Sequence, residues 1–120
     1  MFEMSVDFVL ECAHKTPGFP EGHPNSRLHG HTYYGSLVLR SPSQSTEGFV
    51  RDVGLVKGIL NPVIEELDHR YLNDIPDLGP PSSENIAKWI FRKLSQSLPE
   101  LYAVSIKRPS VQMAVTFFGR

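Results

Sequence analysis

Alternation of apolar and polar residues with a period of two dominates the N-terminal segment. The apolar side chains occupy every second position: Phe2, Met4, Val6, Phe8 and Leu10. This is the pattern of a β-strand with one buried face, and continued alternation places Cys12 and His14 on that face. Three later segments alternate in the same way: residues 28–40, 102–108 and 111–118. The last two are predicted to form a hairpin around Pro109 and Ser110.

Between residues 40 and 102, apolar residues recur at helical spacing. Asp52 is the predicted N-cap of a first helix, and Pro62 is expected to kink this helix or to mark a restart. Its buried stripe is expected to comprise the following residues: Leu55, Ile59, Val63, Ile64 and Leu67. Ser82 or Ser83 is expected to cap a second helix, which Pro99 ends. The order ββααββ predicts an α+β fold, an antiparallel four-stranded sheet with both helices on one face.

The length of 120 residues predicts a single domain, spanning residues 1–120. Its formal net charge of −1 predicts no nucleic-acid partner and no membrane partner. Cys12 is the only cysteine, so no intrachain disulfide can form and a cytoplasmic location is expected. No signal-peptide order or membrane-spanning apolar run is evident. Open edges of a small sheet can be covered by oligomerisation, so we expect a homo-oligomer.

Three of the histidines suggest a metal site. Alternate residues of a strand lie about 6.7 Å apart on one face, so His29 and His31 can bind one ion. If the first two strands are neighbours, His14 reaches the same point. Three imidazole ligands with an open fourth position are typical of catalytic zinc. For the His-x-His pair taken alone, a polar strand edge is the commoner explanation, so that alternative stays open.

A wider resemblance covers most of the chain. Its segments are Phe8 to His14, Pro20 to His23, Arg27 to His31, Gly48 to Asp52, Leu67 to Asn73, and Pro81 to Ala87. In these segments, and in their order, the chain resembles the 6-pyruvoyltetrahydropterin synthase family. It is more closely similar to the bacterial branch of that family, the 6-carboxytetrahydropterin synthases of queuosine biosynthesis.

The resemblance implies a T-fold, in which subunits join into trimeric barrels and two trimers stack as a hexamer with pockets at subunit boundaries. It implies zinc (Zn2+) held by three residues: His14, His29 and His31. It also implies a lyase acting on a pterin-type substrate, dihydroneopterin triphosphate, with elimination of triphosphate. In the family a cysteine moves protons with the support of an Asp-His pair, and Asp68 and His69 stand at the positions of that pair. Glu84 matches a residue that contacts the pterin.

Two positions depart from the family pattern. Asn25 stands four residues before His29, where the bacterial branch has its cysteine, and an amide cannot abstract a proton at neutral pH. Arg108 follows Ile106-Lys107, where the family has a glutamate that binds N–H donors of the pterin. A guanidinium offers only donors, so the usual binding of the pterin is lost or reversed. The family's usual activity is therefore in doubt.

Three explanations remain open. Catalysis persists with a relocated base, for which Cys12 is the candidate, although a buried small hydrophobe is the commoner role for such a residue. Alternatively, the chemistry has changed, and Arg108 binds an acceptor-rich substrate (an oxidised ring, a carboxylate or a phosphate) in a retained zinc pocket. In the third, the protein is a non-catalytic descendant that binds a pterin- or purine-like ligand or simply assembles. Independently of these explanations, the predicted substrate-binding residues are Glu84, Arg108 and Asn25.

Overall fold

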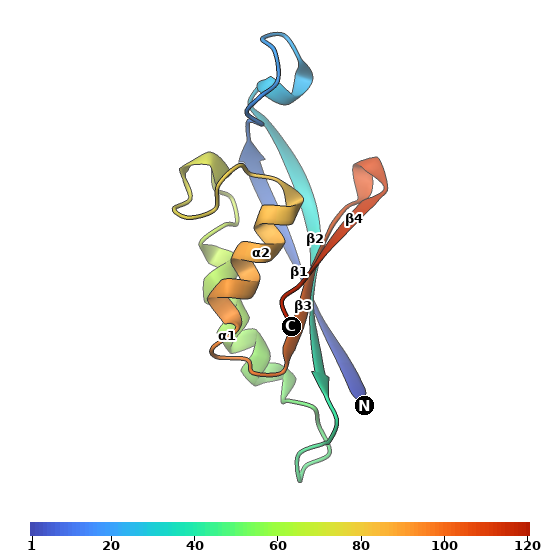
Figure 1. Cartoon of the computed structure of the whole chain (residues 1–120). Coiled ribbons are helices and arrows are strands. Elements are labelled where there is room, and N and C mark those ends of the chain that lie inside the picture. Colours follow the sequence, from blue (N-terminus) through green and yellow to red (C-terminus); the bar gives the residue numbers. More distant parts are fainter.

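The computed structural model describes all residues, 1–120, as one four-stranded sheet and two α-helices. The elements are β1 (Phe2–His14), β2 (His29–Ser41), α1 (Val53–Glu65), α2 (Ser83–Leu94), β3 (Leu101–Arg108) and β4 (Met113–Phe118). Short 3-10 turns lie between them: η1 (Pro24–Ser26), η2 (Leu72–Asp74) and η3 (Pro109–Val111). The strands pair antiparallel in the order β1-β2-β3-β4, and both helices cover the same face (Figure 1). The predicted fold is confirmed. None of the helices has the length and apolar character needed to cross a membrane.

β1 and β2 form a long hairpin that positions the candidate site. Their register runs without interruption from Phe2 opposite Ser41 to His14 opposite His29. β3 pairs with β2 only from Tyr34 to Leu39, so the His29 end of the hairpin extends past the third strand. The loop of residues 15–28 continues beyond this end, at the top of Figure 1. The hairpin thus carries its last residues to the margin of the sheet, where side chains can face a ligand.

The core lies between the sheet and the helices, as the alternation predicts. Each strand of the long hairpin and its neighbour β3 contributes alternate buried residues, and α2 contributes one side of its helix: Val6, Phe8, Leu10, Leu37, Leu39, Val104, Ile106, Ile86, Ile90 and Leu94. Cys12 and His14 continue the buried alternation of β1. His14 therefore points to the helix side of the sheet.

The first helix begins as predicted, but its buried face differs from the predicted stripe. Asp52 caps α1 by accepting the N–H of Leu55 at 2.9 Å. Leu55 itself is 46% exposed, whereas Val56 and Leu60 are buried. The rest of the predicted stripe does pack on the core: Leu67 is buried, and Ile59, Val63 and Ile64 are partly buried against it. The prediction was wrong for Leu55 only, because Val56 takes its place in the first turn of the helix. No restart occurs at Pro62, since α1 continues to Glu65 and loses only the one N–H that proline lacks.

Ser82 is the N-cap of α2, accepting the N–H of Asn85 at 3.1 Å. The helix ends at Leu94, five residues before the predicted stop at Pro99, and turns bonded to the Leu94 carbonyl fill the interval. The predicted second strand of the C-terminal hairpin also starts late. Val111 lies in η3 and is 49% exposed, and Gln112 has a left-handed backbone with φ of 49°. The wider turn shifts the start of β4 to Met113.

Two glycines with opposite surroundings test the packing of the hairpin. Gly35 of β2 lies opposite Phe8 of β1, and a methyl group there would overlap the Phe8 ring. We expect Gly35→Ala to lower the free energy of unfolding by about 1–3 kcal/mol, as overpacking does. Gly58 lies within α1 with open space around it, so Gly58→Ala should raise the free energy of unfolding by about 0.5–1 kcal/mol. Urea unfolding of both variants measures this, and equal stability of Gly35→Ala and wild type would contradict the expected overlap.

Candidate metal centre

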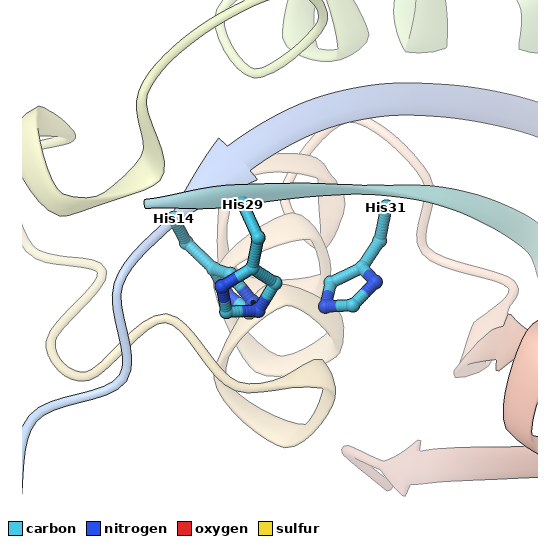
Figure 2. A group of neighbouring side chains, drawn as sticks. All are labelled: His14, His29 and His31. Atoms are coloured by element: carbon cyan, nitrogen blue, oxygen red, sulfur yellow. Dashed lines mark hydrogen bonds between the residues drawn. The ribbon is translucent and has the colours of Figure 1, made fainter. Parts of the chain in front are cut away.

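His14, His29 and His31 meet on the helix side of the sheet at the far end of the β1–β2 hairpin (Figure 2). His14 and His29 are register partners, and His31 lies two residues farther along β2, opposite Cys12. One ring nitrogen from each residue lies within 4.8 Å of the others. The three rings that the sequence predicts to converge are therefore brought together by strand pairing and side-chain alternation.

The hydrogen bonds of His14 and His29 determine where their protons lie. Nδ1 of His14 donates to the Pro81 carbonyl at 2.8 Å, and Nδ1 of His29 donates to the Arg27 carbonyl at 2.6 Å. With Nδ1 protonated, each neutral ring has a lone pair on Nε2. These two Nε2 atoms lie 2.9 Å apart. Two facing lone pairs repel each other unless a cation or a proton lies between them, so this arrangement fits a metal ion.

His31 completes the cluster but has different partners. Its Nδ1 is 3.3 Å from Nη2 of Arg108, while its Nε2 is buried and has no hydrogen-bond partner. Figure 2 shows one ring nitrogen of His31 directed at the rings of His14 and His29 and the other directed away. A buried ring nitrogen without a partner is costly, and a metal ligand role would satisfy it. The donor set thus fits a metal held by three imidazoles.

The electrostatic environment favours the neutral form of two of the rings, His14 and His31. Burial lowers the pKa of His14 below its ordinary value, and the charges of His29 and Arg108 add to this effect. The pKa of His31 falls from 6.5 to about 4, first because of burial and then because of Arg108 and the other two histidines. Neutral imidazoles are the form that binds metal ions. At neutral pH both rings are therefore uncharged, which metal binding requires.

The predicted Asp68-His69 pair forms at the outer edge of β1. Asp68 accepts the N–H of Glu11 and the Nδ1–H of His69, both at 2.8 Å, and these bonds lower the pKa of its carboxyl, the Glu11 bond most. His69 has a left-handed backbone with φ of 58°, and its N–H donates to the Glu11 carbonyl. An uncommon backbone conformation in a non-glycine residue is held here by pairing with β1. No hydrogen bond connects this pair to the three histidines.

The residues that follow His69 also form backbone hydrogen bonds with β1. The N–H of Ala13 donates to the Arg70 carbonyl at 3.0 Å, and Ala13 and Tyr71 form a parallel bridge. Asn73 exchanges two side-chain hydrogen bonds with the backbone of Lys15, both at 2.9 Å. The segment 68–73 is thereby attached to the end of β1. A cleft of about 470 Å³ lies beside it and is lined in part by Glu11, Thr32 and His69.

Cys12 has the surroundings of a buried hydrophobe, the commoner role for it. Its side chain is buried and donates to the Leu67 carbonyl at 3.3 Å. Burial, with smaller effects of Asp68 and Glu11, raises the pKa of the thiol to about 12. A thiol with such a pKa is almost fully protonated at neutral pH. The structure therefore argues against Cys12 as a relocated base. Strand alternation buries its thiol, where it donates to the Leu67 carbonyl and stays protonated.

The remaining predicted residues are distributed around the cluster. Asn25 lies in η1, where its backbone N–H donates to Nδ1 of His23 and its backbone carbonyl accepts the N–H of Thr16. Glu84 is exposed in the first turn of α2. Neither has a hydrogen bond to the three histidines, whereas Arg108 does contact the cluster. Sequence reasoning missed the carbonyl groups of residues 27 and 81 that orient two of the rings, because backbone acceptors leave no signal in residue type.

Comparisons with known proteins identify the family of the chain. A family model described as 6-pyruvoyl tetrahydropterin synthase matches residues 3–118. The chain belongs to this family. It is 38% identical over 126 residues to a 6-carboxy-5,6,7,8-tetrahydropterin synthase of Synechocystis sp., covering 100% of this chain and 96% of the relative.

Two further relatives extend the comparison. The chain is 40% identical over 84 residues to a dihydroneopterin monophosphate aldolase of Pyrococcus furiosus, covering 70% of this chain and 68% of the relative. A solved structure of Caenorhabditis elegans 6-pyruvoyl tetrahydropterin synthase superposes with a TM-score of 0.85 at 26% identity, covering 99% of this chain and 96% of that one. The predicted T-fold is thereby confirmed for the subunit.

Replacement of one ring tests the metal centre directly. We expect the purified wild-type protein to retain one metal ion per chain and His31→Ala to lose it, because two ligands remain where three are needed. Elemental analysis after dialysis measures the metal-to-protein ratio. His23→Ala is the matched control, since His23 is an exposed histidine outside the cluster and its loss should leave the ratio unchanged. Equal metal content in wild type and His31→Ala would contradict this assignment.

The lowered histidine pKa values predict how the metal-free protein responds to acid. Between pH 6.5 and about 4 the unfolded chain binds a proton at His31 that the folded chain resists, so the free energy of unfolding should fall as the pH drops through this window. Thermal unfolding in the presence of a chelator measures the effect. His31→Gln should show a shallower decline, since it removes one of the responsible groups. An identical decline in the variant would show that other groups cause it.

Proposed function

We propose that this protein is a zinc-dependent lyase that acts on a pterin-type substrate such as dihydroneopterin triphosphate. The observation that supports this most strongly is the convergence of three imidazoles, two of them with their Nε2 lone pairs directed at one point. Three nitrogen ligands leave a coordination position open, as in catalytic zinc sites. Zinc bound there would acidify a substrate hydroxyl and polarise a developing carbonyl.

The names of the relatives support the substrate class. The Synechocystis relative is named for a tetrahydropterin product and the Pyrococcus furiosus relative for dihydroneopterin monophosphate. We propose that Glu84 binds the pterin ring in this chain. Glu84 lies in the first turn of α2, three residues after Pro81, whose carbonyl orients His14. We propose that the Glu84 carboxylate, an acceptor for ring N–H donors, contacts the ring of a substrate held at the metal cluster.

We assign the proton transfer to Asp68 and His69. Asp68 accepts the Nδ1–H of His69, which leaves Nε2 of the imidazole free to take a proton. The His69 side chain is 78% exposed, and Asp68 is its one hydrogen-bond partner. The His69 side chain is therefore accessible from outside its own subunit, which fits a site that a neighbouring copy of the chain completes.

The assembly that we propose is a hexamer of two stacked trimers. β1 and β4 are the two outer strands of the sheet, and their backbone groups can pair with the corresponding strands of adjacent copies to close a barrel. The site would then combine the histidines of one subunit with the Asp68-His69 pair of another. We also propose a cytoplasmic location, because a buried free thiol at Cys12 fits a reducing compartment.

Two residues that the family resemblance implies at the site, a proton-transferring cysteine and a glutamate that contacts the ring, are replaced in this chain by Asn25 and Arg108. Asn25 offers an amide where the family has cysteine, and Cys12 has a pKa near 12, so neither side chain is a base at neutral pH. This observation also favours a second candidate function, a non-catalytic protein that binds a pterin- or purine-like ligand. Both the lyase and the non-catalytic protein would bind a pterin-type ligand, but only the lyase would convert it.

Restoring the family residues tests the proposed function. Wild type should convert dihydroneopterin triphosphate at a rate about 10²- to 10⁴-fold below that of the Asn25→Cys, Arg108→Glu double variant, since general acid–base catalysis contributes about this much. Each single variant should gain less, because base and ring contact act together. Release of triphosphate from the zinc-loaded protein measures the rate, and light scattering on the same sample measures its mass.

Two further variants complete this test. Asp68→Asn in the double variant should remove the gain, since the amide cannot hold the same His69 tautomer. Cys12→Ala should leave the rate unchanged. Wild-type turnover equal to that of the double variant would contradict our account of Asn25 and Arg108. Ligand binding without turnover in every variant would favour the non-catalytic candidate.

A further inference from the structure

Arg108 carries a positive charge that no carboxylate of the chain balances. It lies at the end of β3, and none of the ion pairs in the structure includes it. Its Nε is buried without an acceptor, and the one acceptor that its guanidinium contacts is Nδ1 of His31. Guanidinium groups in such surroundings ordinarily bind a carboxylate or a phosphate. The free donors of Arg108 therefore indicate an acceptor group that comes from outside the chain.

The contact with His31 and metal binding by His31 require different tautomers. Arginine only donates, so Nδ1 of His31 must be the acceptor and its proton must lie on Nε2. Ligation of a metal through Nε2 requires the proton to lie on Nδ1 instead. A protonated Nδ1 would then face the N–H of Arg108. The Arg108 contact and the metal–His31 bond are thus mutually exclusive.

We propose that Arg108 is a specificity-determining residue that metal binding releases from His31, so that the metal-loaded site recognises a ligand by an oxyanion group placed beside the metal. This inference rests on the metal centre of the proposed function and concerns the ligand of the wild-type protein. The Asn25→Cys, Arg108→Glu double variant exchanges this oxyanion contact for a carboxylate that accepts from the N–H donors of a pterin ring. The position favours such a ligand because Arg108 is on the same face of the sheet as the histidines, two residues beyond the buried Ile106.

The proposal has a thermodynamic consequence. If the metal must displace Arg108 to bind His31, any group that binds Arg108 elsewhere raises the affinity for the metal, and the metal raises the affinity for that group by the same factor. A carboxylate or phosphate of the ligand can supply this group, since both match the planar donors of a guanidinium. Recognition of the ligand and retention of the metal are therefore coupled through one side chain.

Nitrogen-15 NMR of labelled histidine tests the tautomer exchange. In the metal-free wild type, we expect His31 to carry its proton on Nε2 and His14 and His29 to carry theirs on Nδ1. Addition of zinc should move the His31 proton to Nδ1. Spectra of His31→Gln assign the signals. A His31 proton on Nδ1 before zinc is added, or one that stays on Nε2 when zinc is bound, would overturn the proposal while leaving the metal centre intact.

Zinc affinity provides a second measurement. Arg108→Met removes the competing donor and should bind zinc about 2- to 10-fold more tightly than wild type, the range expected for one hydrogen bond. Lys107→Met is the matched control, because it removes one positive charge at the neighbouring, exposed position. Equal affinity in the two variants would show a general charge effect and would overturn the proposal. Failure of every variant to bind zinc would contradict the proposed function and this inference with it.

Inorganic phosphate and acetate serve as probes of the oxyanion. Zinc-loaded wild type, freed of excess zinc, should bind at least one of them about 10-fold or more tightly than zinc-loaded Arg108→Met does, as expected for a charged hydrogen bond. Preference for phosphate would identify a phosphoryl group, and preference for acetate a carboxylate. Binding of both anions that is independent of Arg108 would overturn the assignment of this residue to ligand recognition.

Discussion

The unbroken antiparallel register of β1 and β2 is the constraint on which the rest of the structure depends. It places His14 opposite His29 and Cys12 opposite His31, so that the three imidazoles occupy neighbouring positions on one face. A shift by one residue would turn each ring of one strand to the opposite face. The buried apolar residues earlier in the same strands hold this register, because any slip would also expose them. Core packing and the metal centre are therefore determined by the same pairing.

Neutrality and donor direction make the cluster a binding site. Backbone carbonyls at Arg27 and Pro81 orient two of the rings, and burial keeps the imidazoles of His14 and His31 uncharged. The third ring, His31, has the guanidinium of Arg108 as its partner where the other two have a backbone carbonyl. An anionic partner would strengthen His31 as a ligand, whereas Arg108 weakens it. The site thus has two rings arranged for the metal and one ring whose arrangement depends on what else is bound.

Local patterns predicted the fold and the three histidines because both follow from alternation along a strand, which is a property of the sequence itself. They failed where neighbours in space decide the outcome. Leu55 fits a helical stripe but is exposed because α1 packs through Val56 and Leu60. Cys12 shares the face of His14 as predicted, yet its thiol stays protonated and donates a hydrogen bond to the Leu67 carbonyl. The contact between Arg108 and His31 joins residues 77 positions apart, and no local pattern contains it.

The attachment of residues 68–73 to the end of β1 also limits how strands can be added to this sheet. Glu11 and Ala13 already use outward backbone groups of β1 for bonds to His69 and Arg70. A strand that joins this edge from another molecule can therefore pair only with the part of β1 that precedes Glu11. The segment acts as a stop at one end of the edge, and a stop of this kind sets the alignment of an incoming strand. The turn that carries the Asp68-His69 pair would thus also fix the register of a strand added to this edge from another molecule.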